Sequence, residues 1–277
     1  MIYLDNGATT PMDPAAVDAM VPFFSEGFGN ASSLHHLGAR SARAVREARS
    51  IFAEALGGKP DEIVFTGGGT EADNLGTRGA ALSAANRRRH ALLFALEHPA
   101  VRNQREFLER QGFTVDTIPC TPDGLVDMAA LEGQLRPEET ALVAVMHANN
   151  EIGTLQPLEA VGELLADLCP KAHFHVDAVQ SFSKTAVRPR RWNASSVALA
   201  GHKLHGPKGV GVLWLKKGAR VRPLHVGGGQ ERGVRPGTEN VPGIVGFGAA
   251  ARLALEGMAT DVPRMQQLRD RLFAALS

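Results

Sequence analysis

A lysine between two apolar segments is a candidate reactive residue in this sequence. Lys203 lies in "LAGHKLHGPKG" (199–209), and apolar runs flank it at 197–199 and 210–214. Lysine is rarely buried without a partner, and burial lowers the pKa of its ammonium group. The neutral amine that results is a nucleophile toward aldehydes. We therefore expect Lys203 to be buried between two strands as a reactive group held in a site.

A glycine turn provides a possible anion site. The apolar run "EIVFT" (62–66) leads into Gly67, Gly68, Gly69 and Thr70, where a helical pattern begins. Backbone N–H groups and the positive end of a helix dipole suit a phosphate. The turn lacks the Gly-Lys-Ser/Thr of a nucleotide P-loop and the G-x-G-x-x-G of a dinucleotide site. A tight turn without any ligand remains the alternative.

Three polar residues alternate along a further apolar run. His173, His175 and Asp177 lie at period two in "HFHVDAVQS" (173–181), so they share one face of a strand. Three interpretations stay open: a metal site, a hydrogen-bonded core histidine with a capping aspartate, or part of a cofactor site. No further strong ligand follows at a suggestive spacing, and His173 begins the strand, where we expect it to face solvent.

These features together match the needs of pyridoxal 5'-phosphate. A helix-terminal phosphate site, an aspartate and a reactive lysine each lie at the end of a predicted strand. Lys203 would form a Schiff base with the cofactor aldehyde, and Asp177 would keep the pyridine nitrogen protonated so that the ring acts as an electron sink. His98, at the end of "HALLFALEH" (90–98), would stack on the ring. We expect no metal.

The elements that must position these residues alternate between strands and helices. Strands are expected at 61–66, 90–98, 113–120, 140–150, 173–181, 195–201 and 209–215. Helices are expected at 37–58, 70–86, 100–112, 127–135, 158–169 and 262–277. This alternation predicts an α/β fold with a mostly parallel seven-stranded sheet and helices on both faces. Ligands bind such sheets beyond the carboxyl ends of the strands.

Composition argues against several classes of protein. The 277 residues hold 30 Lys and Arg against 29 Asp and Glu, a net charge of +1, which gives no electrostatic case for nucleic acid or a membrane surface. The basic cluster "RRRH" (87–90) is expected in a solvated loop. No apolar run is long enough to cross a bilayer, no signal peptide is evident, and two cysteines make no disulfide framework. We expect a cytoplasmic protein.

Eight motifs resemble those of one known family. They are "YLDNGATTP", "GNASSLHHLG", "DEIVFTGGGTEADNL", "EHPAV", "MHANNEIGTLQP", "HVDAVQS", "AGHKLHGPKGVG" and "GGGQERGVRPGTENV", in family order across essentially the whole chain. The chain resembles the cysteine desulfurases of the nitrogen-fixation and iron–sulfur-cluster type, in the class V aminotransferase family of fold-type I pyridoxal enzymes. The last motif favours the desulfurases over siblings such as a selenocysteine lyase or an aminotransferase.

The resemblance implies a role for each matching residue. Lys203 and His98 would be catalytic, Asp177 would pair with the pyridine nitrogen, and Asn30 and Asn150 would face the substrate amino acid. The cofactor-binding set would be Gly69, Thr70, His98, Asn150, Asp177, Gln180, His202, Lys203 and Thr238. Gln180 and Asn150 would lie near the phenolic oxygen, and Gly69, Thr70 and His202 at the phosphate. Thr238 would reach the phosphate of a second subunit, which implies a homodimer.

The resemblance also implies a domain organisation. Residues 13–258 would form the large cofactor-binding domain, and residues 1–12 would belong with a small α+β domain. The strand–helix rhythm ends near 256–263, so we expect residues 259–277 to begin that small domain, which this chain truncates.

The family reaction converts L-cysteine to L-alanine and leaves sulfur on an enzyme thiol as a persulfide. An acceptor or scaffold protein takes the sulfur for iron–sulfur cluster assembly or tRNA thiolation. The family's acceptor-cysteine loop and its carboxylate-binding arginine lie in the small domain, and these 277 residues match neither. Cys120 and Cys169 are expected to be packing residues, and Ala200 replaces a usual phosphate-binding serine. We expect the chain to be inactive alone; a natural short form that binds the cofactor and a partner is the alternative.

Overall fold

The computed structural model describes residues 2–276, and its centre is one seven-stranded sheet. The strand order is β1-β7-β6-β5-β4-β2-β3, and only β7 runs antiparallel to its neighbours. The strands are β1 (Ile63–Thr66), β2 (His90–Phe94), β3 (Thr114–Ile118), β4 (Thr140–Ala144), β5 (His173–Asp177), β6 (Ser196–Ala200) and β7 (Gly211–Leu215). The predicted fold class, a mostly parallel seven-stranded sheet, is confirmed.

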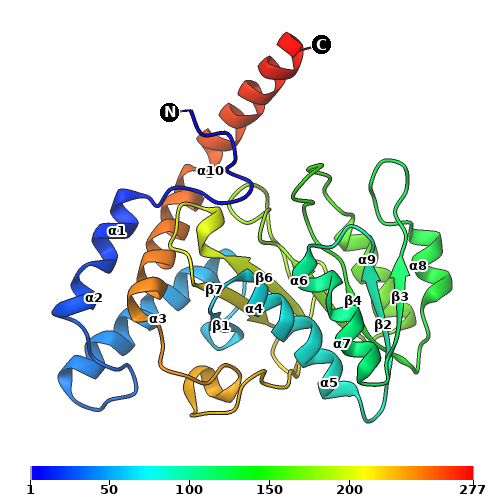
Figure 1. The fold of residues 1–277 in the computed structure, drawn as a ribbon, viewed down its shortest axis with the longest axis horizontal. Coiled ribbons are helices and arrows are strands. Elements are labelled where there is room, and N and C mark those ends of the chain that lie inside the picture. The colour runs from blue at the N-terminus through cyan, green and yellow to red at the C-terminus, as the bar shows by residue number, and fades with distance from the viewer. Residues whose placement is uncertain (1, 277) are drawn as a thin grey trace.

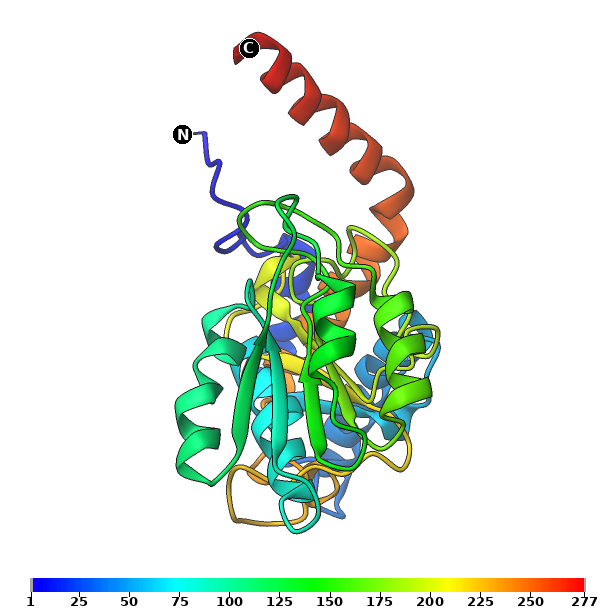
Figure 2. The same ribbon diagram turned by 90° about the vertical axis from the view of Figure 1, so that its right-hand side faces the viewer.

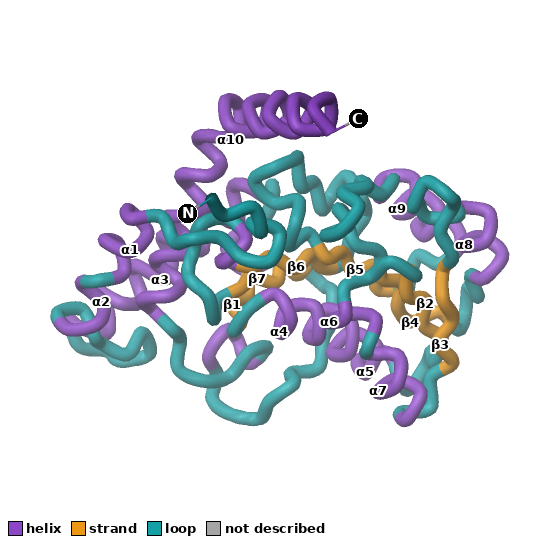
Figure 3. Tube along the Cα trace, turned by 45° about the horizontal axis from the view of Figure 1, so that its top comes forward, coloured by secondary structure: helices purple, strands orange, loops and turns teal. Residues whose placement is uncertain are grey.

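Helices cover both faces of this sheet (Figure 1). One layer, seen below the strands in Figure 3, holds α4 (Gly69–Asn74), a π-helical turn (Leu75–Gly79), α5 (Ala80–Ala84), α6 (Pro99–Arg102) and α7 (Gln104–Arg110). The opposite face packs against α3 (His36–Ala55), α8 (Met128–Gln134), α9 (Leu158–Leu168) and the first half of α10 (Val241–Leu276). The short helices α1 (Pro14–Met20) and α2 (Pro22–Ser25) lie against α10.

The larger core lies between the sheet and α3, α8, α9 and α10. Val45, Ala48 and Phe52 recur at helical spacing on α3 and are buried. The Phe52 ring lies 4.5 Å from that of Phe247 on α10. The helix ends where Gly57 adopts φ +61, a left-handed conformation that glycine reaches without steric cost. This layer holds the sheet rigid behind the strand ends.

Several predicted boundaries are wrong in detail. The strands are shorter than their apolar runs; β2 ends at Phe94, so His98 follows the strand by a turn, and β4 ends at Ala144. The helix expected at 100–112 is two helices that meet at Asn103. Backbone bonds continue for a residue or two beyond several strands, as from the Val145 N–H to the His175 carbonyl, and side chains then take part; the buried Glu97 carboxylate, for example, accepts from Met146 N at 2.5 Å. The segments that follow the strands are therefore loops, and their side chains can form a site.

The helix expected to begin at 262 begins at Val241 and runs through the predicted boundary without interruption. Pro263 lies inside it, and the second half of α10 projects away from the body (Figure 2). Proline has no backbone N–H, so one carbonyl of the preceding turn loses its helical hydrogen bond. The loss in stability is smallest where water can bond to that carbonyl instead. Exposed apolar side chains continue along this projecting half, among them Met265, Leu268 and Leu272.

A buried ion pair fixes the loop 227–239 to the sheet. Arg49 of α3 and Glu231 make two hydrogen bonds of 2.8 and 2.6 Å, and Glu231 also accepts from the Phe65 backbone N–H of β1 at 3.1 Å. Glu231 has φ +45, which is unusual for a residue with a side chain. The pair therefore compensates for local backbone strain beside the glycine turn that follows β1.

We predict that Arg49→Met lowers the free energy of unfolding by about 3 kcal/mol, because it leaves the Glu231 carboxylate buried without its partner. The matched control is Arg43→Met on the same helix, where the Arg43–Glu47 pair is exposed. Urea denaturation of the two variants should separate them clearly. Equal midpoints for both would contradict an anchoring role for the buried pair.

Candidate active site

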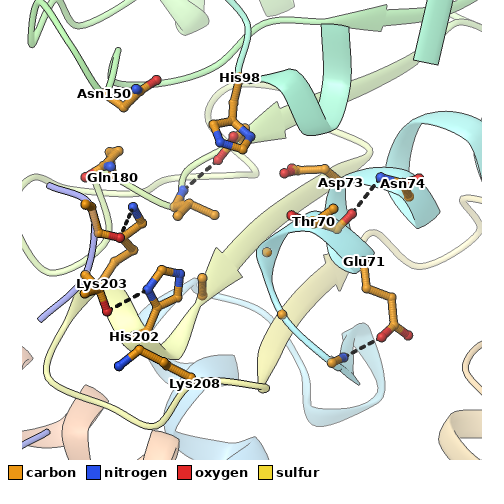
Figure 4. A pocket seen from close by; sticks show the side chains of 18 of the residues that line it. Thr70, Glu71, Asp73, Asn74, His98, Asn150, Gln180, His202, Lys203 and Lys208 are labelled. Atoms are coloured by element: carbon orange, nitrogen blue, oxygen red, sulfur yellow. Dashed lines mark hydrogen bonds between the residues drawn. The ribbon is translucent and has the colours of Figure 1, made fainter. Parts of the chain in front are cut away.

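A cleft of about 1220 Å³ opens beyond the carboxyl ends of the strands. Eight of the ten residues that the sequence proposed for the site line it: Gly69, Thr70, His98, Asn150, Asp177, Gln180, His202 and Lys203. They follow β1, β2, β4, β5 and β6, whose carboxyl ends meet at this edge of the sheet. Figure 4 shows Gln180 and Lys203 on one side, Thr70, Glu71 and Asp73 on the other, and His98 between them.

Lys203 ends a 3₁₀ turn (Gly201–Lys203) that directly follows β6. Its Nζ donates to the carbonyl oxygens of Gly7 at 2.5 Å and Ala8 at 2.9 Å. The expectation of a fully buried lysine is wrong: the strands on either side are buried, but the side chain is half-buried at the cleft. Partial desolvation still lowers its pKa, against the opposing effect of Asp177. The amine therefore lies in the cleft with a pKa below that of an exposed lysine.

Asp177 is the last residue of β5, and its carboxylate is buried. Oδ1 accepts from the Val179 backbone N–H at 2.9 Å. Burial raises the pKa of Asp177 to about 7, with a smaller contribution from Asp73. Ionising a buried carboxylate is costly unless a cation lies beside it. A protonated pyridine nitrogen would supply that cation, so Asp177 fits the ring end of pyridoxal phosphate.

His98 caps the N-terminus of α6. Its Nδ1 accepts from the Ala100 backbone N–H at 3.1 Å, so the neutral ring carries its proton on Nε2. One ligand-type atom each of His98, Asp73 and Asp177 lie within 4.8 Å of one another. This group shares only Asp177 with the H-x-H-x-D pattern, in which the sequence suggested a possible metal site.

The other two histidines of that pattern bond to side chains of neighbouring elements of the fold. His175 bonds to Asp73 of α4 at 3.2 Å, and His173 bonds to Ser196 of β6 at 2.7 Å. The expectation that His173 faces solvent is wrong, because it is buried. The hydrogen-bonded core interpretation therefore describes His173 and His175 as the structure has them.

The glycine turn after β1 leads into α4, whose first residue is Gly69. Gly68 has φ +150, which residues with a side chain rarely adopt. A Cβ on Gly69 would lie 2.9 Å from Val179 and 3.2 Å from Ala200. The turn therefore needs glycine for backbone conformation and for close packing, and it lines the same cleft as His202 and Lys208.

Glu71 and Arg235 complete this turn, and the sequence interpretation missed both. Glu71 accepts from the Gly67 N–H at 2.6 Å, and Arg235 bonds to Glu71 at 2.8 Å. The arginine compensates for a carboxylate that would otherwise repel an anion. Arg235 lies in the motif that also holds Glu231, so one loop supports the turn from two sides.

The N-terminal segment crosses one side of the cleft. Gln180 Nε2 donates to Gly7 O at 2.8 Å, and the ring nitrogen Nδ1 of His202 lies 3.2 Å from Thr9 Oγ1. Thr10 bonds to the His202 carbonyl through its backbone N–H at 2.9 Å and its hydroxyl at 3.0 Å. Residues 7–10 therefore orient Lys203, Gln180 and His202, a role that no local signal predicted.

Two proposed residues do not reach the cleft of this chain. Asn30 is exposed and accepts from Ser32 N at 2.9 Å, and Thr238 is exposed on the loop after Glu231. Neither cysteine lines the cleft: Cys169 is buried at the end of α9, where burial raises the pKa of its thiol, and Cys120 pairs with Val126 in a β-bridge.

Comparison with known proteins gives a consistent match. A family model described as aminotransferase class V matches residues 2–277. A "cysteine desulfurase" of Cereibacter sphaeroides is 49% identical over 98% of this chain and 69% of its own length. One of Nostoc sp. is 46% identical over 98% of this chain and 67% of its own length. The chain thus spans about two thirds of the length of these relatives.

Solved structures agree with the fold. A "NifS-like protein" superposes with a TM-score of 0.96 at 38% identity, covering 99% of this chain and 75% of the other. A structure described as "SspA in complex with cysteine" superposes with a TM-score of 0.86 at 37% identity, covering 91% and 72%. Within residues 2–276, no helix is both long and apolar enough to span a membrane.

We predict that Asp177→Asn changes the pH dependence of folding stability in the cofactor-free protein. The folded carboxyl has a pKa of about 7, raised from 3.8, so wild type loses stability as pH rises from about 4 through 7. The variant has no such group and should be more stable than wild type at pH 8, on the order of 2 kcal/mol. Urea unfolding at pH 5 and pH 8 measures the difference. Parallel pH profiles would contradict a buried, reluctantly ionised carboxylate.

Proposed function

The chain belongs to the cysteine desulfurases of the class V aminotransferase family, and from this membership we propose that the cleft binds pyridoxal phosphate and L-cysteine through the residues that line it. Members of this family depend on pyridoxal phosphate. One observation carries the proposal: a half-buried lysine, a buried aspartate, a capping histidine and a glycine turn from four different strand ends meet in one cleft.

The pattern of charge in the cleft supports the orientation of the cofactor. The glycine turn, His202 and Lys208 offer N–H groups and cations that would suit a phosphate, and the Asp177 carboxylate in the same cleft would suit a protonated ring nitrogen. Gly69, Thr70 and His202 would hold the phosphate, and Gln180 and Asn150 the phenolic oxygen. His98 would contact the ring face.

When bound, pyridoxal phosphate supplies an electron sink for the bonding electrons at the substrate Cα. Lys203 has two tasks in this proposal. Its Nζ would hold the cofactor covalently, and the same amine would move the proton at the substrate Cα. Asn150 would orient the substrate in the cleft of this chain. Asn30, which lies outside that cleft, would act on substrate only after a rearrangement or at a second subunit's site.

We further propose a homodimer in which Thr238 approaches the phosphate of the other subunit. Its exposure, on a loop anchored by the buried Glu231, supports this assignment. Residues 1–12 and 259–277 would belong with a small domain, in keeping with the exposed apolar side chains of the projecting half of α10. The sulfur would pass to an acceptor or scaffold protein for iron–sulfur cluster assembly or tRNA thiolation, in a reducing, cytoplasmic compartment.

We predict that borohydride reduction of the protein with pyridoxal phosphate fixes the cofactor covalently to Lys203. Lys203→Ala should abolish fixation but retain some reversible binding. Lys184→Arg is the matched control: Lys184 Nζ lies 3.3 Å from the Lys203 carbonyl, and burial lowers its pKa to about 8, so it is the competing amine. Peptide mapping by mass spectrometry locates the adduct, and an adduct on Lys184 would contradict the assignment.

We predict that the 277-residue chain by itself releases no alanine or sulfide from L-cysteine with a reductant. Its cleft is lined by no cysteine, so the substrate sulfur meets no attacking thiolate, and loss of orientation alone can cost orders of magnitude in rate. A chimera that adds the remaining segment of the Cereibacter sphaeroides relative should turn over. Comparable rates for both proteins would contradict the prediction, and Cys120→Ser and Cys169→Ser would then identify the responsible thiol.

A further inference from the structure

A row of four buried polar side chains runs from the cleft into the protein behind Asp177. Asp73 Oδ1 lies 3.2 Å from His175 Nε2, His175 Nδ1 lies 2.8 Å from Ser196 Oγ, and Ser196 Oγ lies 2.7 Å from His173 Nε2. All four residues are at least nine-tenths buried. None of them has a part in the roles proposed above.

The strand register and a glycine in the helical layer leave room for these four side chains. His173, His175 and Asp177 alternate along β5 and face the helical layer of α4, while the register of β5 and β6 places Ser196 directly opposite His175. Gly76 lies in the π-helical turn above them, and a Cβ there would lie 2.3 Å from His175 Nδ1 and 3.0 Å from Ser196 Oγ. Insertions of this kind in helices are frequent at functional sites.

The bonding capacity of Ser196 makes the row directional. Its hydroxyl has one proton and lies between two imidazole nitrogens, so it donates to one histidine and accepts from the other. If Asp73 is protonated, it donates to His175 Nε2, His175 Nδ1–H donates to Ser196, and Ser196 donates to His173. If Asp73 is ionised, all three bonds reverse. One proton at Asp73 therefore fixes both histidine tautomers.

The charges around Asp73 decide which direction holds. Asp177 from β5 and Glu97 from the turn after β2 are both buried carboxyls that interact with it. Asp73 also bonds to His175 and has a carboxyl oxygen within 4.8 Å of a His98 ring nitrogen, while Glu71, Arg78 and Lys203 line the same cleft. Burial raises the pKa of Asp73 to about 8. Among the described residues the Asp177 carboxylate accepts a backbone N–H and the Asp73 carboxyl bonds to His175, so Asp177 ionises first as pH rises and the last proton stays on Asp73.

We propose that Asp73 is a positioning residue that keeps one proton in this carboxyl pair and leaves Asp177 as the anion, and that His175, Ser196 and His173 form a relay through which this proton exchanges with the opposite edge of the sheet. The consequence for the pyridine nitrogen rests on the function proposed above. The relay itself concerns only residues of this chain.

The far end of the relay opens on a second cavity of about 660 Å³. His173 lines it together with Arg87, Arg88, Lys171, Lys216, Lys217 and Arg220. Burial lowers the pKa of His173 to about 3, with a smaller contribution from His175, so the ring stays neutral. Protons would therefore move by exchange of neutral tautomers, with no imidazolium formed in the core.

The test is histidine side-chain ¹⁵N NMR of the cofactor-free protein between pH 6 and 9.5. We expect both His173 and His175 to carry the proton on Nδ1 at pH 6–7 and to switch together to Nε2 as Asp73 ionises above pH 7. Asp73→Asn, which keeps a neutral donor at this position, should remove the switch from both rings. Ser196→Ala should leave the response of His175 and abolish that of His173.

Ser195→Ala is the matched control, since Ser195 Oγ accepts from the Phe174 N–H at 3.1 Å and lies outside the row. It should leave the joint switch unchanged. A His175 ring protonated on Nε2 at pH 6–7, or a His173 ring that responds equally in Ser196→Ala, would overturn the proposal. Because no cofactor is present, failure of pyridoxal phosphate to bind would count against the proposed function and leave this result unaffected.

Discussion

A carboxylate buried at the end of a strand, with no cationic group of the described residues 2–276 hydrogen-bonded to it, is the constraint on which the rest of this site depends. Asp177 is held by β5 and by the Val179 N–H, and burial makes it reluctant to ionise. Folding around such a group costs free energy that a bound cation would return. Asp177 therefore provides the anion of an ion pair whose cation must come from the ligand. The position of this carboxylate decides which end of the ligand lies beside it.

The remaining groups are oriented by parts of the chain far away in sequence. Residues 7–10 hold Lys203, Gln180 and His202, and the loop after 227 supports the glycine turn through Glu231 and Arg235. These supports lie at opposite ends of the chain. Segments from both ends of the chain can contact the same cleft because the parallel sheet brings the carboxyl ends of its strands to one edge.

The sequence predicts the local parts of this site well. Period two along 173–177 placed His173, His175 and Asp177 on one face, and the glycines before Thr70 marked a helix start. Contacts between distant segments were not predictable, because no periodicity encodes them: the burial of His173 depends on Ser196, and the orientation of Lys203 on Gly7. Asp73 left one signal, an acid on the apolar face of the helical pattern 70–86. The sequence does not predict the uninterrupted α10, because the end of the strand–helix rhythm near 256–263 indicates a boundary there.

The most direct test of the central claim is the protonation state of the pyridine nitrogen in bound cofactor, measured by NMR with ¹⁵N-labelled pyridoxal phosphate at pH 8. With Asp177 as the buried anion, we predict a protonated nitrogen in wild type and an unprotonated one in Asp177→Asn. An unprotonated nitrogen in wild type, or no difference between the two proteins, would contradict the claim that this carboxylate is buried to hold a cation.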